Sequence, residues 1–348
     1  MMTTVDKLID LDLPVLLWGP PGVGKSSMVR AIAERRGWKL IDMRLSQMSP
    51  VDLRGIPVPD HQTGRTKWYP PAELPLAERD GDQGILFLDE LLQAPRDVQS
   101  AALQLVLDRR LGEYELPKGW RIIAASNRVS DQTGSYQIIA ALANRFVHIP
   151  VGCSLPPLHL DSSESITLDF DAWKKWAYEN NVHPNVIGFL SYRPDFLWKA
   201  TGQVAFATPR TWADYVSKIL HHIGPDFTAV AGCIGEGPAT EFTAFCNLQD
   251  KLPPVQDILD GKEADVPSAP DVLYALSCAI VSALIRLKGK STLQRAVTNV
   301  MRYTLRLPSE FQVLILKDAF GAGLAAHFSK LDDFRTWAAQ NRSIVLAA

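Results

Sequence analysis

Residues 15–26 read VLLWGPPGVGKS: four apolar residues lead into a loop of glycine and proline, and a helical pattern over 25–36 follows. Backbone N–H groups in such a loop can converge on one small anion. The amino end of the helix adds partial positive charge at the same place. This order of strand, loop and helix therefore predicts a cradle for a phosphate group.

The loop fits the pattern G-x-x-x-x-G-K-[ST], in which each residue type has a chemical use. Lys25 is expected to reach the β- and γ-phosphates of a nucleotide, and the Ser26 hydroxyl is expected to bind Mg²⁺. The residues of this segment expected to contact the nucleotide are Gly19, Pro20, Pro21, Gly22, Val23, Gly24, Lys25, Ser26 and Ser27.

A second motif, ILFLDE at residues 85–90, places two carboxylates after an apolar run. Asp89, at the carboxyl end of a buried strand, is expected to hold Mg²⁺ and so to join the nucleotide-binding residues. Glu90, beside the metal, is suited to orient and deprotonate a water molecule that attacks the terminal phosphate. A kinase that phosphorylates a small molecule has less use for this glutamate.

Three more residues are candidates for the site because of their positions in the chain. Asn127 follows an apolar run and could donate a hydrogen bond to the γ-phosphate or to the attacking water. Arg145 lies just before the apolar run at 146–149, and Arg210 opens a helical pattern. An arginine from a neighbouring subunit can stabilise the charge that develops on a transferring phosphoryl group.

The first 150 residues alternate apolar runs with helical patterns, which is typical of a parallel sheet covered by helices. The runs are apolar throughout, as expected of strands buried on both faces. We therefore expect an α/β fold in this part. The expected strands are 15–18, 39–43, 85–89, 121–126 and 146–149, with helices at 25–36 and 95–109.

Proline and turn residues divide the rest of the chain. The segment 49–75 is too long for a simple connection and carries the turn sequence HQTGRT, which predicts a hairpin insert. A linker follows residue 150, and a proline-rich acidic segment at 250–271 is expected to be a second break. The expected domains are an α/β nucleotide-binding domain at 1–150, a linker and helical domain at 151–250, and a C-terminal helical extension at 251–348.

Composition narrows the class of protein. With 36 basic and 38 acidic residues the formal net charge is -2, which gives no support for a broad nucleic-acid-binding surface. The longest uncharged run, 272–285, is too short to cross a bilayer and fits a buried helix; with no signal-like amino terminus, a cytoplasmic protein is expected. Widely spaced cysteines indicate unpaired thiols; they are Cys153, Cys233, Cys246 and Cys278.

These motifs occur in the order found in AAA+ ATPases, and the chain resembles the MoxR-type branch of that family over about residues 10–222. The resemblance is carried by SPVDLRGI ahead of the insert, by LDELLQAPRDVQSAALQLVLDRRLGEYELP and by ANRF before the last strand. It implies a P-loop NTPase fold with a five-stranded parallel sheet of order 5-1-4-3-2 and a helical lid, with ATP and Mg²⁺ as cofactors. The implied roles are Walker A for Lys25 and Ser26, Walker B for Asp89 and Glu90, first sensor for Asn127, arginine finger for Arg145 and second sensor for Arg210.

Two departures from the family pattern leave the arginine finger open. Asn144 stands where family members more often have aspartate, and Arg128 follows Asn127 where they usually have proline. Arg109, Arg110 or Arg128 could therefore share the role in trans.

The resemblance implies a site completed across a subunit boundary in a ring, usually of six. The leading hypothesis is a chaperone-like ATPase that remodels or activates a protein partner, with the insert at 49–75 and a second hairpin around 111–120 touching that client. MoxR-type proteins typically work with a partner bearing a von Willebrand factor A domain. Two alternatives stay open: a nucleic-acid motor, which the near-neutral charge disfavours, and a P-loop kinase for a small molecule, which Glu90 and Arg210 disfavour.

Overall fold

The computed structural model describes residues 2–62, 64–128, 131, 134–136, 138, 140–152, 168–199 and 204–341, with the backbone alone for 2, 3, 249 and 250. Within it the chain divides into two compact units, Met1–Leu168 and Asp169–Ala348. The first is a sheet covered by helices, and the second is built mainly of helices. Cys153 and most of the predicted linker after residue 150 lie outside the described residues.

A five-stranded parallel sheet of order β2-β5-β8-β1-β9 forms the centre of the first unit. These are the second, third, fourth, first and fifth of the predicted strands, so the predicted order 5-1-4-3-2 is confirmed when the sheet is read from β9. Because all five strands are parallel, their carboxyl ends meet at one edge. The strands are β1 (Val15–Trp18), β2 (Lys39–Arg44), β5 (Gln83–Asp89), β8 (Gly119–Ser126) and β9 (Val147–Pro150).

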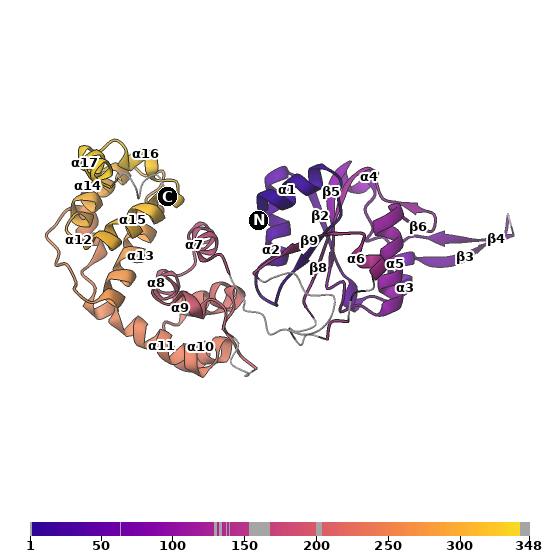
Figure 1. Ribbon diagram of the computed structural model, residues 1–348, viewed down its shortest axis with the longest axis horizontal. Coiled ribbons are helices and arrows are strands. Elements are labelled where there is room, and N and C mark those ends of the chain that lie inside the picture. Colours follow the sequence, from indigo (N-terminus) through magenta and orange to yellow (C-terminus); the bar gives the residue numbers. More distant parts are fainter. Residues whose placement is uncertain are drawn as a thin grey trace. The chain divides into compact units, whose positions relative to one another are not determined.

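Side chains of each strand alternate between two hydrophobic cores on the two faces of the sheet. Val15 of β1 belongs to a core shared with α1 and α2, and Leu16 to the opposite core, shared with α5 and α6. Figure 1 shows α1 and α2 on one side of the sheet and α5 on the other. These helices are α1 (Met2–Asp10), α2 (Lys25–Arg36), α5 (Arg96–Asp108) and α6 (Ala140–Ala143).

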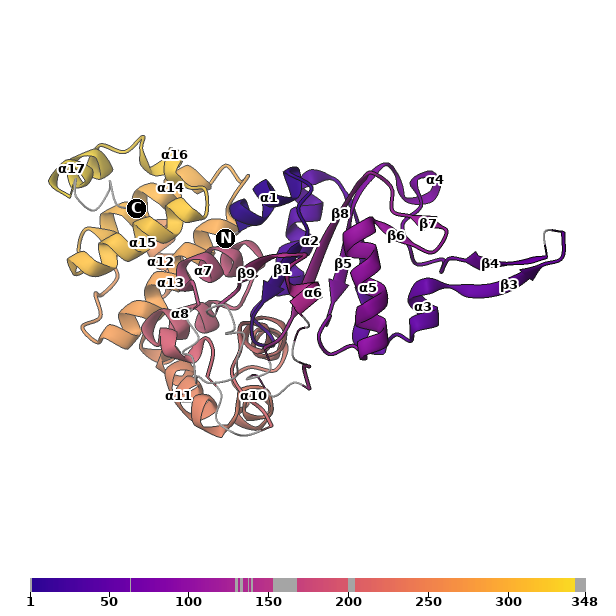
Figure 2. The ribbon, with the colours of Figure 1, turned by 45° about the vertical axis from the view of Figure 1, so that its right-hand side comes forward.

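The predicted insert is an antiparallel hairpin, β3–β4, that projects away from the sheet (Figures 1 and 2). Pro57 and Pro59 occupy alternate positions of β3, opposite Trp68 and Thr66. The second predicted hairpin is the short pair β6–β7. The remaining elements of this unit are η1 (Leu45–Gln47), α3 (Pro50–Arg54), β3 (Ile56–Asp60), β4 (Arg65–Tyr69), α4 (Ala77–Asp80), β6 (Arg110–Leu111) and β7 (Tyr114–Glu115).

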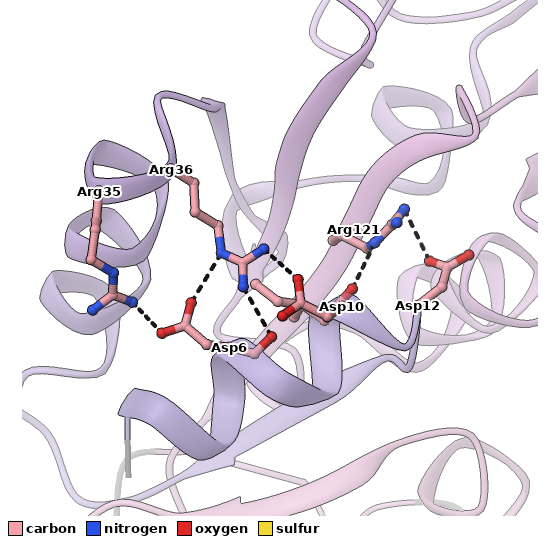
Figure 3. Close-up of polar contacts among 7 residues, drawn as sticks. Asp6, Asp10, Asp12, Arg35, Arg36 and Arg121 are labelled. Atoms are coloured by element: carbon pink, nitrogen blue, oxygen red, sulfur yellow. Dashed lines mark hydrogen bonds and ion pairs between the residues drawn. The ribbon is translucent and has the colours of Figure 1, made fainter.

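A set of ion pairs holds α1 against the rest of the first unit (Figure 3). Arg36, the last residue of α2, pairs with Asp6 at 3.0 Å and with Asp10 at 2.6 Å. Arg121, near the start of β8, pairs with Asp12 at 3.4 Å. The amino-terminal helix therefore ties the far end of α2, the helix that follows the glycine-rich loop, to a central strand.

In the second unit, the uncharged run at 272–285 is part of α13, whose apolar residues are buried as predicted. The break predicted at 250–271 is wrong in part, because α12 lies inside it between Pro254 and Gly261, which supply a helix start and a left-handed helix end. Within the described ranges, no helix is long and apolar enough to cross a bilayer. The elements are α7 (Phe170–Glu179), α8 (Pro184–Tyr192), η3 (Pro194–Phe196), η4 (Thr211–Val216), α9 (Ser217–His222), α10 (Phe227–Ile234), α11 (Glu236–Cys246), η5 (Asn247–Lys251), α12 (Val255–Asp260), α13 (Pro270–Arg286), α14 (Leu293–Thr304), α15 (Ser309–Gly321), α16 (Ala325–Phe328) and α17 (Asp332–Gln340).

A buried ion pair joins the first helix of this unit to its carboxyl-terminal helices. Lys174 of α7 lies 2.5 Å from Asp318 of α15, and the Tyr178 hydroxyl donates to the same carboxylate at 3.1 Å. Both charged side chains are less than a tenth exposed. Removal of one partner would leave the other charge buried and uncompensated, so this contact is costly to break.

His183 precedes α8 and caps it with a neutral imidazole. Its Nδ1 accepts a hydrogen bond from the Asn185 N–H at 3.2 Å, and its ring packs edge-on against that of His221. Burial lowers the pKa of His183 to about 4, with smaller contributions from His221 and Arg286. His221 and His222 are both exposed.

We predict that the second unit loses stability as the pH falls from 6.5, the ordinary pKa of histidine, to about 4. In this window the unfolded chain binds a proton at residue 183 that the folded chain does not, so acidification favours unfolding. His183→Asn keeps a capping side chain without this proton and should flatten the dependence of the unfolding midpoint on pH. Thermal unfolding followed by circular dichroism tests this, with His222→Asn as the matched control; equal slopes in the two variants would contradict it.

Candidate nucleotide site

The glycine-rich loop joins the carboxyl end of β1 to the first turn of α2. Gly24, directly before α2, has a φ of 96°, a left-handed conformation that glycine adopts without steric cost. At Gly19 an added Cβ would lie 2.3 Å from the carbonyl oxygen of Val151, so only glycine fits against the chain that leaves β9. The loop is thus confined to a tight curve, as a convergent set of N–H groups requires.

Lys25, the first residue of α2, is 8% exposed and its ammonium group has acceptors from two strand ends. Its Nζ donates to the carbonyl oxygens of Gly19 at 2.6 Å and Pro20 at 3.1 Å, both after β1. It also donates to Oδ1 of Asn127 at 2.7 Å, directly after β8. Two predicted site residues that lie far apart in the sequence are therefore in direct contact.

Ser26 and Asp89 are also brought together, because β5 ends beside this edge of the sheet. The Ser26 hydroxyl donates to Oδ2 of Asp89 at 2.9 Å. Hydroxyl and carboxylate oxygens are ligands that Mg²⁺ prefers, so the pair fits that ion. The described residues hold no cluster of three or more His, Cys, Asp or Glu side chains able to bind a metal unaided. Magnesium does not need one, because it retains waters and takes further oxygens from phosphates.

Glu90 lies in a tight turn after β5. Its φ is 57°, a left-handed backbone that is uncommon for a residue with a side chain. The turn is fixed by hydrogen bonds from the Glu90 N–H to Oδ1 of Asp89 at 2.9 Å and from the Leu91 N–H to the Ala125 carbonyl at 3.1 Å. The Ser46 hydroxyl, in η1, donates to Oε2 of Glu90. The Glu90 carboxylate, which is predicted to activate water, is thus held by a residue just after the end of the neighbouring strand β2.

Negative charge gathers on the β2 side of the site. Partial burial raises the pKa of Asp42 and the charge of nearby Asp89 raises it further, whereas Arg44 and Arg30 lower it and Glu90 raises it slightly. Ionised carboxylates this close together repel one another, and a divalent cation between them relieves that repulsion. Lys25 and the amino end of α2 carry positive charge next to this acidic side. The edge of the sheet is therefore suited to a metal ion on one side and phosphates on the other.

Ser46 and Asp42 were not predicted as site residues. The pairing of β2 with β5 explains why Ser46 belongs to the site. β2 pairs in parallel with β5, with Arg44 opposite Asp89. A polar residue just after β2 must therefore lie beside the two carboxylates once the strand order is known. Ser46 can therefore be identified only after the strand order has placed the end of β2 beside the end of β5.

The remaining predicted loop residues lie where expected, but their contacts to a nucleotide stay predictions. Pro21, Gly22 and Val23 form the half-buried middle of the loop, and Gly22 has a φ of 79°. Ser27 follows Ser26 in the first turn of α2 and is exposed.

Arg145 lies near the amino ends of the parallel strands, whereas the glycine-rich loop of its own chain follows the carboxyl end of β1. Arg145 stands between α6 and β9, whose Val147 is level with Val15 at the start of β1. The length of β1, about 10 Å at the usual rise per residue, separates the two positions. The side chain of Arg145 is exposed. The fold does not bring Arg145 to Lys25 or Asp89.

Arg210 belongs to the second unit, at the start of a helix formed by the π-helical segment η4 and by α9. The helix start is fixed by Thr208 and Thr211, each of which accepts the other's N–H on its side-chain oxygen. The Arg210 side chain is exposed. Its role as second sensor stays a prediction.

The alternative arginine fingers all make contacts within the first unit. Arg109 forms an ion pair with Asp12 at 3.0 Å and donates to the backbone carbonyl oxygens of Pro117 and Trp120. Arg128 is 5% exposed and pairs with Asp131 at 2.8 Å. Arg110 forms an exposed pair across the β6–β7 hairpin. These contacts favour Arg145 over the other three.

Comparison with known proteins finds a family model that matches part of the first unit, and several relatives that match part of the chain. Residues 14–146 match the family model described as an AAA domain of the dynein-related subfamily. Midasin of Giardia intestinalis is 31% identical over 156 residues, 42% of this chain and 3% of Midasin. Protein NorQ of Paracoccus denitrificans is 33% identical over 124 residues, 33% of this chain and 44% of NorQ. Denitrification regulatory protein NirQ of Pseudomonas aeruginosa is 36% identical over 100 residues, 28% of this chain and 36% of NirQ.

The chain spans less than half the length of these relatives, and the matches cover less than half of the chain. They confirm the resemblance to MoxR-type AAA+ ATPases for the first unit. Residues 14–146 contain every predicted site residue except Arg210. The second unit is outside the matched family model.

We predict that Gly19→Ala weakens nucleotide binding by about tenfold or more, the effect of roughly 1.4 kcal/mol. The new Cβ would meet the Val151 carbonyl at 2.3 Å and displace the carbonyl oxygens that hold Lys25. Titration with a fluorescent ATP analogue measures the affinity. Gly232→Ala, where an added Cβ has no atom within 4 Å, is the control and should bind normally. Unchanged affinity in a folded Gly19→Ala protein would show that this contact does not set the loop.

Proposed function

We propose that this chain, whose residues 14–146 match an AAA domain model and which resembles MoxR-type AAA+ ATPases, hydrolyses ATP to remodel or activate a protein partner. The observation that carries the proposal is the meeting of Lys25 with Asn127 and of Ser26 with Asp89 at one edge of the sheet. A basic group for the phosphates and oxygen ligands for a metal then lie side by side, with Glu90 next to the metal ligand.

Each of these groups has one task in the hydrolysis we propose. Lys25 neutralises charge on the β- and γ-phosphates, and Ser26 and Asp89 would hold Mg²⁺, which would supply further positive charge to the phosphates. Glu90 orients a water molecule and accepts its proton as the water oxygen bonds to the γ-phosphorus. The bond from that phosphorus to the β–γ bridging oxygen breaks, so that ADP and inorganic phosphate leave. Asn127 uses its carbonyl oxygen for Lys25 and keeps its amide N–H₂ group for the γ-phosphate or the water.

We propose that Arg145 acts on the nucleotide of the next subunit in a ring, with six subunits as the number typical of the family. Its exposure and its distance from the loop of its own chain support a role in trans. A guanidinium supplied by a neighbour stabilises the charge on the transferring phosphoryl group. A role of Arg210 as second sensor is proposed from the family resemblance alone.

A protein client is supported by apolar surface at the base of the β3–β4 hairpin. A groove of about 940 Å³ there is lined by Val51, Ile56 and Tyr69, which are 49%, 61% and 57% exposed, and by charged side chains of both signs. Exposed apolar side chains that share one groove are typical of sites for proteins and not for phosphate backbones. A partner with a von Willebrand factor A domain and a cytoplasmic location are proposed from the family resemblance alone.

A nucleic-acid motor is the second candidate, because Arg65 and Lys67 lie exposed on the projecting strand β4. The overall charge of -2 argues against it. Stimulation of ATP hydrolysis by DNA that disappears steeply with added salt would favour this candidate over a protein client. Transfer of phosphate to a metabolite would instead indicate a kinase, which Glu90 disfavours.

We predict that Glu90→Gln retains ATP binding but loses hydrolysis by about a hundredfold or more, because the amide cannot accept the proton of the attacking water. Released phosphate measures turnover, and a fluorescent ATP analogue measures binding. Glu115→Gln, an exposed carboxylate of the β6–β7 hairpin, is the control and should hydrolyse ATP normally. Rapid hydrolysis by Glu90→Gln would exclude Glu90 as the base.

We predict that Lys25→Ala and Arg145→Ala proteins, each inactive alone, regain part of the activity when mixed. Some interfaces then combine an intact nucleotide site with an intact arginine, whereas neither pure ring contains such an interface. Phosphate release is measured over a range of mixing ratios, and sedimentation confirms that both proteins assemble. Assembly without any recovered activity would count against Arg145 as the finger.

A further inference from the structure

The end of β1 and the turn that carries Arg145 are joined through one histidine. Trp18, the last residue of β1, donates from Nε1 to Nδ1 of His148 at 2.7 Å. The other ring nitrogen of His148, Nε2, lies 2.8 Å from the carbonyl oxygen of Ala143, the last residue of α6. The two aromatic rings are stacked, with an angle of 18° between their planes. His148 thus bridges a central strand and a short helix.

The chemistry of this bridge allows a single form of the imidazole. The indole N–H of Trp18 can only donate, so Nδ1 of His148 must be the unprotonated acceptor. Nε2 then carries the proton and donates to Ala143. The side chain is therefore a neutral, oriented connector whose two hydrogen bonds point in different directions.

The connector ends next to Arg145. Leu142 and Phe146 are both buried in the core on the α5 side of the sheet, and Arg145 lies exposed between them. The backbone turns here through hydrogen bonds from the Arg145 N–H to Leu142 at 3.1 Å and from the Phe146 N–H to Ala143 at 3.3 Å. His148 bonds the same Ala143 carbonyl, so it fixes the turn from which the guanidinium projects.

The other end of the connector borders the glycine-rich loop. Trp18 is 3% exposed, and its carbonyl oxygen accepts the Val151 N–H at 2.6 Å. The next residue, Gly19, supplies one of the carbonyl oxygens that hold Lys25. A displacement of β1 at this point would therefore reach both the loop and the Arg145 turn.

We propose that His148, anchored by Trp18, is a positioning residue for Arg145: it sets the finger that one subunit offers to the next. This inference rests on the proposed role of Arg145 in trans. It assigns His148 an effect on the reaction that is exerted through its hydrogen bonds to Trp18 and Ala143. The end of β1 then contacts both the glycine-rich loop of its own nucleotide site and, through His148, the turn whose arginine acts on the site of the next subunit.

Mixed rings test this assignment with His148→Phe, which keeps a stacked ring and removes both hydrogen bonds. Alone, the variant should lose activity by roughly tenfold to a hundredfold, as expected of a misplaced catalytic group. Mixed with Lys25→Ala, which donates an intact finger, it should regain activity, because its own nucleotide site is sound. Mixed with Arg145→Ala, which can only receive a finger, it should not.

The reverse pattern would overturn the proposal. Recovery with Arg145→Ala but not with Lys25→Ala would mean that His148→Phe damages its own nucleotide site and not its finger. Recovery with neither partner, or full activity of His148→Phe alone, would overturn it as well. His148→Gln, which can accept from Trp18 and donate to Ala143, should restore part of the activity lost in His148→Phe; no difference between them would also count against the proposal.

A second measurement separates failure of this inference from failure of the proposed function. If Lys25→Ala and Arg145→Ala do not complement each other, the role in trans fails. Hydrogen exchange in the full chain then decides whether His148 fixes the turn. Amides at residues 143–147 should exchange about tenfold faster in His148→Phe, whereas those of β5 should not change. Unchanged exchange at 143–147 would overturn the inference by itself.

Discussion

The ammonium group of Lys25 depends on acceptors that come from the ends of two neighbouring parallel strands. β1 supplies the carbonyl oxygens of Gly19 and Pro20, and β8 supplies Asn127. Since β5 lies on the other side of β8, the same strand order carries Asp89 to Ser26. A single change in the order of these three strands would disperse the site, so the packing of the two apolar cores is also what assembles the chemistry.

Much of this arrangement could be predicted from the sequence, because the motifs are local. The loop at 19–26 and the pair Asp89–Glu90 each announce a strand end, and unbroken apolar runs locate the buried strands. Ser46 and His148 could not be found in this way, because their importance arises from a neighbour on another strand. Local sequence patterns predict which residues lie at the end of a strand. Only the strand order of the sheet determines which strand ends lie next to one another.

The helical second unit was less accessible to sequence reasoning for a similar reason. The helix at 255–260 was hidden by the prolines and acidic residues around it, which read as a break. The contact of Lys174 with Asp318 spans more than a hundred residues, and neither side chain stands in a motif. This pair joins α7 to α15, a helix that follows the 250–271 segment. A change in composition along the chain therefore need not mark the boundary between two separately packed domains.

The β3–β4 hairpin shows how a projecting strand pair can avoid uncontrolled association. Pro57 and Pro59 occupy alternate positions of β3, and alternate residues of a paired strand direct their backbone groups away from the partner. The outer margin of β3 therefore lacks hydrogen-bond donors at these two positions and is a poor template for another strand. β4 has no proline, so any chain that extends this hairpin would add beside β4, and stacking of hairpins into a continuous ribbon would stop after one step.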